Sequence, residues 1–556
     1  EISECLVGSE MCIRDSYKNS SRNSLSITGA PDNAYAKGVS QIERIMHYIP
    51  DYNGFSVIFI TGTVPYIIIK EDYSISRVLK FANIPLVSMT PWGTQSIMCV
   101  DDIKNARVYT LDIDNVSYEN KLPLKKIEIN TTLDNYMTLT NITYHEKSET
   151  FILSYSKQIE FIAKGEDNEK ITIGAIDNVP HARAFKSGIL LINPKTWNVI
   201  DQIEFDDDTM VNDVKTMLIQ LDSKTKRKIE YVVVGLTNIT SEDVPASGSF
   251  YLYDIITVVP EPGKPDTGFK LKQFFKEDVK SAVTKVCDIS GRFVISQSQK
   301  LMVRDAQEDN SVVPVAFLDV PLYVTDIKSF SNLLIVGDAM QGFQFVGFDA
   351  EPYRMITLGK SITNIETMSL EFLVNNGDLH FLVSDRDDIL HILKYAPDEP
   401  NSLSGQRLIH CSSFNMYSTN TCMIMAPKND EFDEKINNSK QDQTFQALGA
   451  QTDGSIFKVI PLKEDAYRKL YFVQQQLCDK EASLGGLNVR MERQDNDYLE
   501  ITHNVRPMLD ANIIRKYTML PIVRRKNMAK KLGRNAHFDL WREMIDLEFS
   551  LRTLSQ

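Results

Sequence analysis

The sequence predicts an all-β fold, a β-propeller of WD40-like blades without the WD signature, followed by a small C-terminal α-helical domain. Short segments rich in β-branched and aromatic residues recur from about residue 55 to 460, each bounded by Gly, Asp, Asn or Pro. Comparable strand-plus-turn units begin near Ser249, Lys300, Gln341 and Asp388. Their spacing of about 40–50 residues is that of a four-stranded propeller blade. Beyond residue 462 the apolar residues recur at helical spacing.

The composition limits the class of protein. The chain has 556 residues, enough for two to four domains, and its 43% hydrophobic and 24% charged content is ordinary for a globular protein. A net charge of −13 argues against broad non-specific nucleic-acid binding. No apolar run reaches the ~18 residues that a membrane span needs. The seven cysteines form no CxxC pair, so neither a zinc site nor a disulfide framework is predicted.

The first residues, 1–16, lack the features of a signal peptide and do not fit the strand-rich remainder of the chain, so we expect a non-native leader there.

The strand segments succeed one another without intervening helices. A β-sandwich is the alternative to a propeller, but it does not readily account for over 300 residues of continuous strand, whereas ring closure limits exposed edges. The clearest strand segments are 56–60, 66–69, 151–155, 188–192, 231–234, 250–253, 293–295 and 333–336.

The C-terminal segments read as helices. Ala466, Leu470, Val473 and Leu477 recur at helical spacing. Short helices are expected over 510–517 and 521–532, and a strongly amphipathic one over 538–554. An all-β array that continues into a small helical domain favours a scaffold over an enzyme.

No pattern for catalysis or for a cofactor emerges. Gly359-Lys360-Ser361 lacks the glycine that a phosphate-binding loop needs five residues earlier, and no histidine pair has metal-ligand spacing. His380, His391 and His410 lie in neighbouring strand units and can converge, but side chains with structural partners are the simpler interpretation. Asp385–Asp388 is interpreted as a salt-bridged turn. We therefore expect no enzyme activity, no cofactor, no metal and no small-molecule substrate.

One charge feature stands above the background, in the helical part. Eight basic residues fall within twenty that contain no acid. Either they form a solvated face or contact acidic parts of the propeller, or they bind phosphates or an acidic partner. Tyr517 is the one stacking aromatic beside them. The basic residues are Arg515, Lys516, Arg524, Arg525, Lys526, Lys530, Lys531 and Arg534.

An ordered series of motifs resembles the C-terminal half of a family of large three-propeller scaffolds. The series includes Gly54–Tyr66, Asp453–Ile456 and Pro507–Asp510. The family contains the largest subunit of the cleavage and polyadenylation specificity factor, the large subunit of damaged-DNA-binding protein and the propeller subunit of splicing factor 3b. Phe381–Asp387 and Gly486–Arg490 are similar to the cleavage and polyadenylation branch, although Val489 replaces its proline.

The resemblance carries expectations about function. The stretch Gly337–Tyr353 is similar to the budding-yeast form of the cleavage and polyadenylation subunit. The resemblance to the family implies a nuclear, non-catalytic scaffold for pre-mRNA 3′-end processing, which holds WD-repeat and zinc-finger subunits and contacts RNA directly or through them. The alternative is a scaffold of a DNA-damage ubiquitin ligase or a splicing particle. On this view 17–125 ends a second propeller, 126–462 forms a third and 463–556 is the helical domain.

Overall fold

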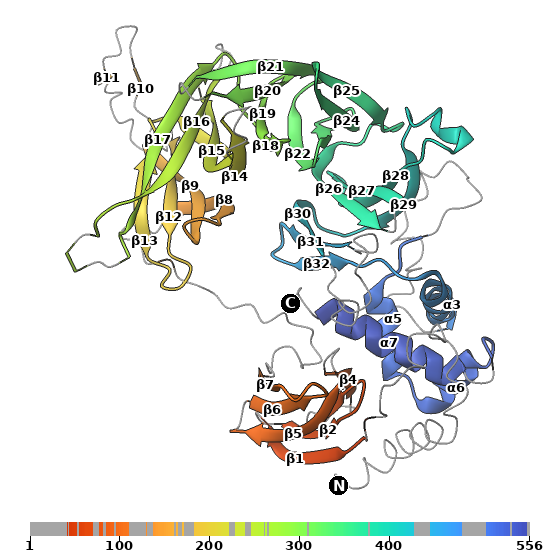
Figure 1. Ribbon diagram of the computed structural model, residues 1–556. Helices are drawn as coiled ribbons and strands as arrows, with labels where there is room; N and C mark the ends of the chain where they lie inside the picture. The colour runs from red at the N-terminus through yellow and green to blue at the C-terminus, as the bar shows by residue number, and fades with distance from the viewer. Residues whose placement is uncertain are drawn as a thin grey trace, which may run out of the picture.

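The computed structural model describes residues 42–552 with gaps, the longest of which are 111–128, 130–136, 172–182, 428–444 and 481–506. The expected leader, 1–16, and the Gly486–Arg490 motif lie outside the described residues. Strands dominate, and the helices gather at the C-terminal end of the chain (Figure 1). The predicted order of an all-β part and a helical part is confirmed.

Two antiparallel sheets at the N-terminal end lie apart from the larger array of strands (Figure 1). Val57, Phe59 and Ile67 bury a common core with Leu86 and Cys99, because side chains alternate between the two faces of a strand. The first sheet contains β1 (Met46–Tyr52), β2 (Phe55–Ile60), β3 (Tyr66–Lys70) and β4 (Arg77–Lys80), and the second contains β5 (Leu86–Trp92), β6 (Ser96–Asp101) and β7 (Ala106–Thr110).

Within the described residues, six further sheets succeed one another around an arc (Figure 1). Five have four antiparallel strands and the last has three. The first sheet holds β8 (Met137–His145), β9 (Thr150–Glu160), β12 (Arg183–Ile192) and β13 (Val199–Glu204), with β10 (Ala163–Lys164) and β11 (Lys170–Ile171) as a separate pair. The second sheet holds β14 (Thr209–Gln220), β15 (Lys228–Asn238), β16 (Ser247–Thr257) and β17 (Phe269–Val279), and the third holds β18 (Val286–Ile289), β19 (Arg292–Gln297), β20 (Lys300–Ala306) and β21 (Val312–Asp319). The fourth sheet holds β22 (Val324–Phe330), β23 (Leu333–Asp338), β24 (Phe343–Ala350) and β25 (Tyr353–Lys360), and the fifth holds β26 (Thr367–Asn375), β27 (Asp378–Asp385), β28 (Ile389–Tyr395) and β29 (Ile409–Asn415). The sixth sheet holds β30 (Asn420–Pro427), β31 (Phe445–Gln451) and β32 (Ile456–Val459).

The sheets are blades, because neighbouring sheets share an apolar core. Five buried clusters each draw residues from two consecutive sheets of the arc. In one of them Phe343 and Phe345 of β24 meet Phe381 of β27, with ring centroids 5.6 Å and 5.0 Å away. Each of the four inner blades thus buries both faces against its neighbours, as the predicted propeller requires, and the first and last blades each share a core with one neighbour.

The predicted repeat has the right spacing but the wrong starting point. Ser249, Lys300, Gln341 and Asp388 lie at or just before the third strands β16, β20, β24 and β28, whereas the sheets begin two strands earlier. Residues with positive φ, at Ser298, Gly342 and Asp388, mark the turn before three of these strands. Such turns are the strongest local signal in the sequence, so a repeat counted from turns begins at the third strand.

The first strand of nearly every blade carries a β-bulge near its start. These strands contact one another in order around the axis of the arc, from β8 to β30. A bulge adds one unpaired residue and redirects the side chains beyond it. The strand pairing skips Thr140, Asn212, Thr325, Met368 and Thr421 in β8, β14, β22, β26 and β30 respectively.

The helices of the described residues are α3 (Glu464–Lys480), α5 (Ala511–Met519), α6 (Ile522–Ala529) and α7 (Ala536–Arg552), besides a 3-10 turn, Pro400–Ser402. They share a core in which Leu470 and Val473 of α3 meet Tyr517 and Leu540. Asp510 caps α5 by accepting a hydrogen bond from the Asn512 backbone N–H at 2.8 Å. No helix of the described residues is long and apolar enough to span a membrane.

The helical domain touches both groups of sheets. Lys458 Nζ of β32 donates to the Ser550 carbonyl oxygen of α7 at 2.6 Å, and the Met508 backbone N–H donates to Ser412 Oγ at 3.0 Å. On another side α7 packs on β4. The helices therefore lie between the N-terminal sheets and the last blades of the arc (Figure 1).

Asp266 joins the β16–β17 loop to the neighbouring blade, and we expect this contact to depend on pH. Its carboxylate accepts hydrogen bonds from Asn198 Nδ2 at 2.9 Å, Thr196 Oγ1 at 3.1 Å and Asn193 Nδ2 at 3.0 Å. These donors, Asn198 and Thr196 first, lower the pKa of Asp266. The contact therefore stabilises the fold above the ordinary carboxyl pKa, and this contribution is lost as the pH falls through the lowered pKa.

The measurement is amide exchange of the turn 193–198, corrected for intrinsic rates. Asp266→Asn is expected to speed amide exchange in the turn at neutral pH. The difference in exchange rate from the parent chain should vanish in strong acid, where Asp266 is protonated. Equal protection of the turn in both chains at neutral pH would contradict the role of the carboxylate.

Candidate partner and nucleic-acid interface

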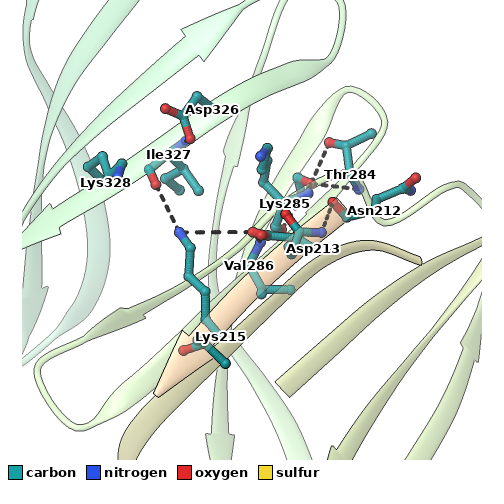
Figure 2. Close-up of polar contacts among 12 residues, drawn as sticks. Asn212, Asp213, Lys215, Thr284, Lys285, Val286, Asp326, Ile327 and Lys328 are labelled. Carbon is teal, nitrogen blue, oxygen red and sulfur yellow. Dashed lines mark hydrogen bonds and ion pairs between the residues drawn. The ribbon is translucent and has the colours of Figure 1, made fainter. Parts of the chain in front are cut away.

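The axis of the arc holds a network of charged side chains (Figure 2). Asp213 of β14 and Asp326 of β22 come directly after the bulged residues of their strands. Asp213 Oδ2 accepts from the Val286 backbone N–H at 3.1 Å, and Asp326 Oδ2 accepts from that of Leu370 at 2.9 Å. Each carboxylate therefore binds the first strand of the next blade.

Two lysines reach one blade further. Lys215 Nζ lies 3.2 Å from the Ile327 carbonyl oxygen and 3.9 Å from Asp213 Oδ2, as Figure 2 shows. Lys328 Nζ lies 2.8 Å from the Met423 carbonyl oxygen and 3.3 Å from Glu371 Oε2. Burial works to lower the pKa of Lys215, but Asp213 and other nearby acidic groups outweigh it, so the pKa is raised and the amine stays charged.

This network is a repeat that the sequence analysis did not detect. Asn212-Asp213-Val214-Lys215 and Thr325-Asp326-Ile327-Lys328 share one pattern in corresponding strands. The polar groups of both segments form hydrogen bonds with other blades, so they hold the blades together. Within the described residues no group of three or more His, Cys, Asp or Glu is placed to hold a metal ion.

Two of the three histidines in neighbouring strand units meet. His391 Nδ1 lies 3.1 Å from His410 Nε2, and His391 Nε2 lies 2.9 Å from Asp385 Oδ2. His380 lies opposite Lys394 in the β27–β28 ladder. Asp385–Asp388, interpreted from the sequence as a salt-bridged turn, does form a turn, in which Asp385 Oδ1 accepts from the Ile389 backbone N–H at 2.8 Å and Arg386 Nη1 lies 3.4 Å from Glu366 Oε2.

The structure divides the eight basic residues into two groups. Arg515 Nε lies 3.0 Å from Glu548 Oε1 of α7, and both side chains are largely buried. The guanidinium of Arg525 lies over the Trp541 ring, 4.4 Å from its centroid. These two arginines pack the helices together. Arg534 lies outside the described residues. The exposed members are Lys516, Arg524, Lys526, Lys530 and Lys531.

The exposed lysines keep their charge available. Across the described part of the chain, no carboxylate lies within ion-pair distance of Lys516, Lys526, Lys530 or Lys531. The surrounding field is positive enough to act on His537, whose pKa is lowered by burial and by Arg525 and Lys526. A negatively charged ligand would be attracted here.

Apolar side chains are exposed in the same segment, and sequence reasoning missed them. In the described part of the helical domain the exposed large hydrophobic residues are Met519, Val523, Leu532 and Phe538, with Val523 65% exposed. In α6 the buried residues Met528 and Ala529 define the inner face. Val523 lies opposite them at helical spacing, beside Lys526 and Lys530. A helical-wheel count of α6 is the signal that would have found this face.

A matched pair of substitutions tests the division of the basic residues. We expect Arg515→Ala to destabilise the helical domain by about 2 kcal/mol, because Glu548 loses a charged hydrogen-bond partner. Lys516→Ala, one residue away but exposed, should stay within about 0.5 kcal/mol of the parent chain. Native-state hydrogen exchange of α5 and α7 measures both effects. Similar exchange in the two variants would contradict the division.

The fold and these sites define a propeller protein with a helical C-terminal domain, whose axial polar groups bind its own blades. Comparison with known proteins agrees with this class. The family model "CPSF A subunit region" matches residues 186–519, and "RSE1/DDB1/CPSF1 second beta-propeller" matches residues 5–111. The chain belongs to the CPSF A subunit family.

Relatives extend the match along nearly the whole chain. Protein CFT1 of Saccharomyces cerevisiae is 62% identical over 97% of this chain and 39% of its own length. Protein CFT1 of Candida albicans is 39% identical over 97% of this chain and 40% of its own length. Protein cft1 of Schizosaccharomyces pombe is 30% identical over 86% of this chain and 33% of its own length. The chain thus spans about two fifths or less of these relatives.

Proposed function

We propose that this chain is part of a non-catalytic scaffold subunit of the nuclear machinery that cleaves and polyadenylates pre-mRNA. The observation that carries the proposal is the identity of 62% to Protein CFT1 over 97% of the chain, together with the match to the CPSF A subunit model. A scaffold also suits a fold whose axial charges bind neighbouring blades.

The proposal includes the domain order and the partners. Residues 17–125 end a second propeller, 126–462 form a third and 463–556 form the helical domain. The scaffold holds WD-repeat and zinc-finger subunits that read the polyadenylation signal. Support for two propellers comes from the separate cores of β1–β7 and of the later blades, and from the second-propeller model, which matches at 5–111.

The test is affinity purification of the full-length protein and mass spectrometry of the proteins that come with it. Recovery of the WD-repeat and zinc-finger subunits with the endonuclease and the poly(A) polymerase is expected. Recovery of a cullin-type ubiquitin ligase or of splicing components would overturn the function and leave the fold unaffected. A matched control is the same purification with the tag on an unrelated nuclear propeller protein, which should not recover these subunits.

A further inference from the structure

The outward face of α6 combines positive charge with exposed apolar surface. Lys526 and Lys530 are four residues apart and therefore neighbours on the helix. Val523 stands beside them, three residues before Lys526. Residues 511–535 contain no acid in a chain of net charge −13. The contact of Lys531 Nζ is with a neutral amide oxygen, Gln476 Oε1, at 3.5 Å.

Neighbouring helices hold α6 in place. Arg525 of α6 lies on Trp541, which fixes the first turns of α7 against α6. Tyr517 Oη lies 3.5 Å from His537 Nδ1, so the C-terminal end of α5 also contacts the first turn of α7. Phe538, 39% exposed, is next to His537 in that first turn. The helices that carry Val523 and Phe538 are thus held together by packed aromatic and cationic groups.

The chemistry of this face favours protein over RNA. Single-stranded RNA is bound by aromatic rings on which bases stack. Three of the four exposed apolar residues, Met519, Val523 and Leu532, are aliphatic and cannot stack a base. The Trp541 ring already has Arg525 over it. Aliphatic and cationic groups side by side complement a helix with one apolar and one acidic face.

We propose that the outward face of α6 binds an acidic amphipathic segment of a partner subunit. Carboxylates of that segment pair with Lys526, Lys530 and Lys531, and its apolar side chains cover Val523. The inference rests on the proposed function, because the partner is a subunit of the processing complex.

The experiment couples lysine amines directly to carboxylates in the purified intact complex, with a zero-length reagent and mass spectrometry. Lys469 Nζ lies 3.0 Å from Glu543 Oε1, so this pair is the internal control for the reaction and for folding of the helical domain. We expect Lys526, Lys530 or Lys531 to couple to Asp or Glu residues of an amphipathic partner segment. An assembled complex that gives the control product but no such coupling overturns the inference and leaves the scaffold role standing.

Variants separate an acidic protein segment from RNA. Val523→Ser and Lys526→Glu should each lower the yield of coupling from Lys530 to the partner about tenfold, since one loses apolar burial and the other a charge pair. Lys195→Glu, exposed in the third-propeller region, is the charge-matched control and should change nothing. If Lys526→Glu weakens binding of the complex to a uridine 20-mer while Val523→Ser changes neither RNA binding nor coupling, the face binds RNA and the inference is wrong. If the unmodified protein did not assemble with processing subunits, the proposed function and this inference would both be wrong.

Discussion

Replacing Phe381 by alanine is expected to destabilise the propeller by about 4 kcal/mol. Phe381 of β27 is fully buried between two blades. Its ring touches Phe345 of the preceding blade and Phe372 of its own, with centroids 5.0 Å and 5.9 Å away. Truncation removes the transfer free energy of the ring and leaves a cavity that two packed sheets cannot close. Urea unfolding, monitored by hydrogen exchange of β24 and β27, measures the loss.

Two controls make this result specific. Phe381→Leu keeps most of the volume and should cost about 1 kcal/mol. Phe317 of β21 is 59% exposed, so Phe317→Ala should cost less than about 1 kcal/mol. If Phe317→Ala proved as destabilising as Phe381→Ala, the shared cores between blades would not be the main source of stability.

The sequence predicts the strands well because the signal for them is local. Tyr231 to Val234 are buried without a break, and the run of β-branched residues there indicates a strand with both faces covered. The boundaries of the blades depend instead on which strands pair. Gly342 and Asp388 mark turns inside a sheet, and nothing in the adjacent residues distinguishes such a turn from one between sheets.

The axial network shows a second limit. The pattern shared by residues 212–215 and 325–328 is visible in the sequence, but short polar patterns of this kind occur by chance. Its meaning depends on the bulges at Asn212 and Thr325, which redirect the next side chains toward the adjacent blade. A bulge is set by the register of two strands, and register is not written in one segment alone.

The basic segment stands out by its charge, but charge alone cannot assign the roles of its residues. Arg515 and Lys516 are adjacent, yet Glu548, 33 residues later, pairs with the first. The partner depends on how α5 and α7 cross. Exposed Val523 was missed for a related reason, since the outward face of α6 is defined by the buried Met528 and Ala529.

Glu371→Ala is expected to destabilise the propeller by about 3 kcal/mol, because it leaves Lys328 charged at the axis without its carboxylate. Burial works to lower the pKa of Lys328, but Glu371 and Asp326 outweigh it, so the pKa is raised. Burial also raises the pKa of Glu371, which indicates that the pair carries a desolvation cost. The exposed pair Asp349–Arg354, at 2.9 Å, is the control, and Asp349→Ala should cost at most about 0.5 kcal/mol.

The double variant Lys328→Met/Glu371→Leu decides what the axial charges contribute. Removing both members also removes their desolvation cost, so the double variant should recover most of the stability that Glu371→Ala loses. A double-mutant cycle of urea unfolding measures the coupling. Recovery would mean that the charge pair adds no net stability, since apolar residues of similar size hold the blades together as well. Failure to recover would place the stability in the bond from Lys328 Nζ to the Met423 carbonyl, which joins β22 to β30 across the intervening blade. A methionine side chain at position 328 has no N–H group and cannot donate a hydrogen bond to that carbonyl.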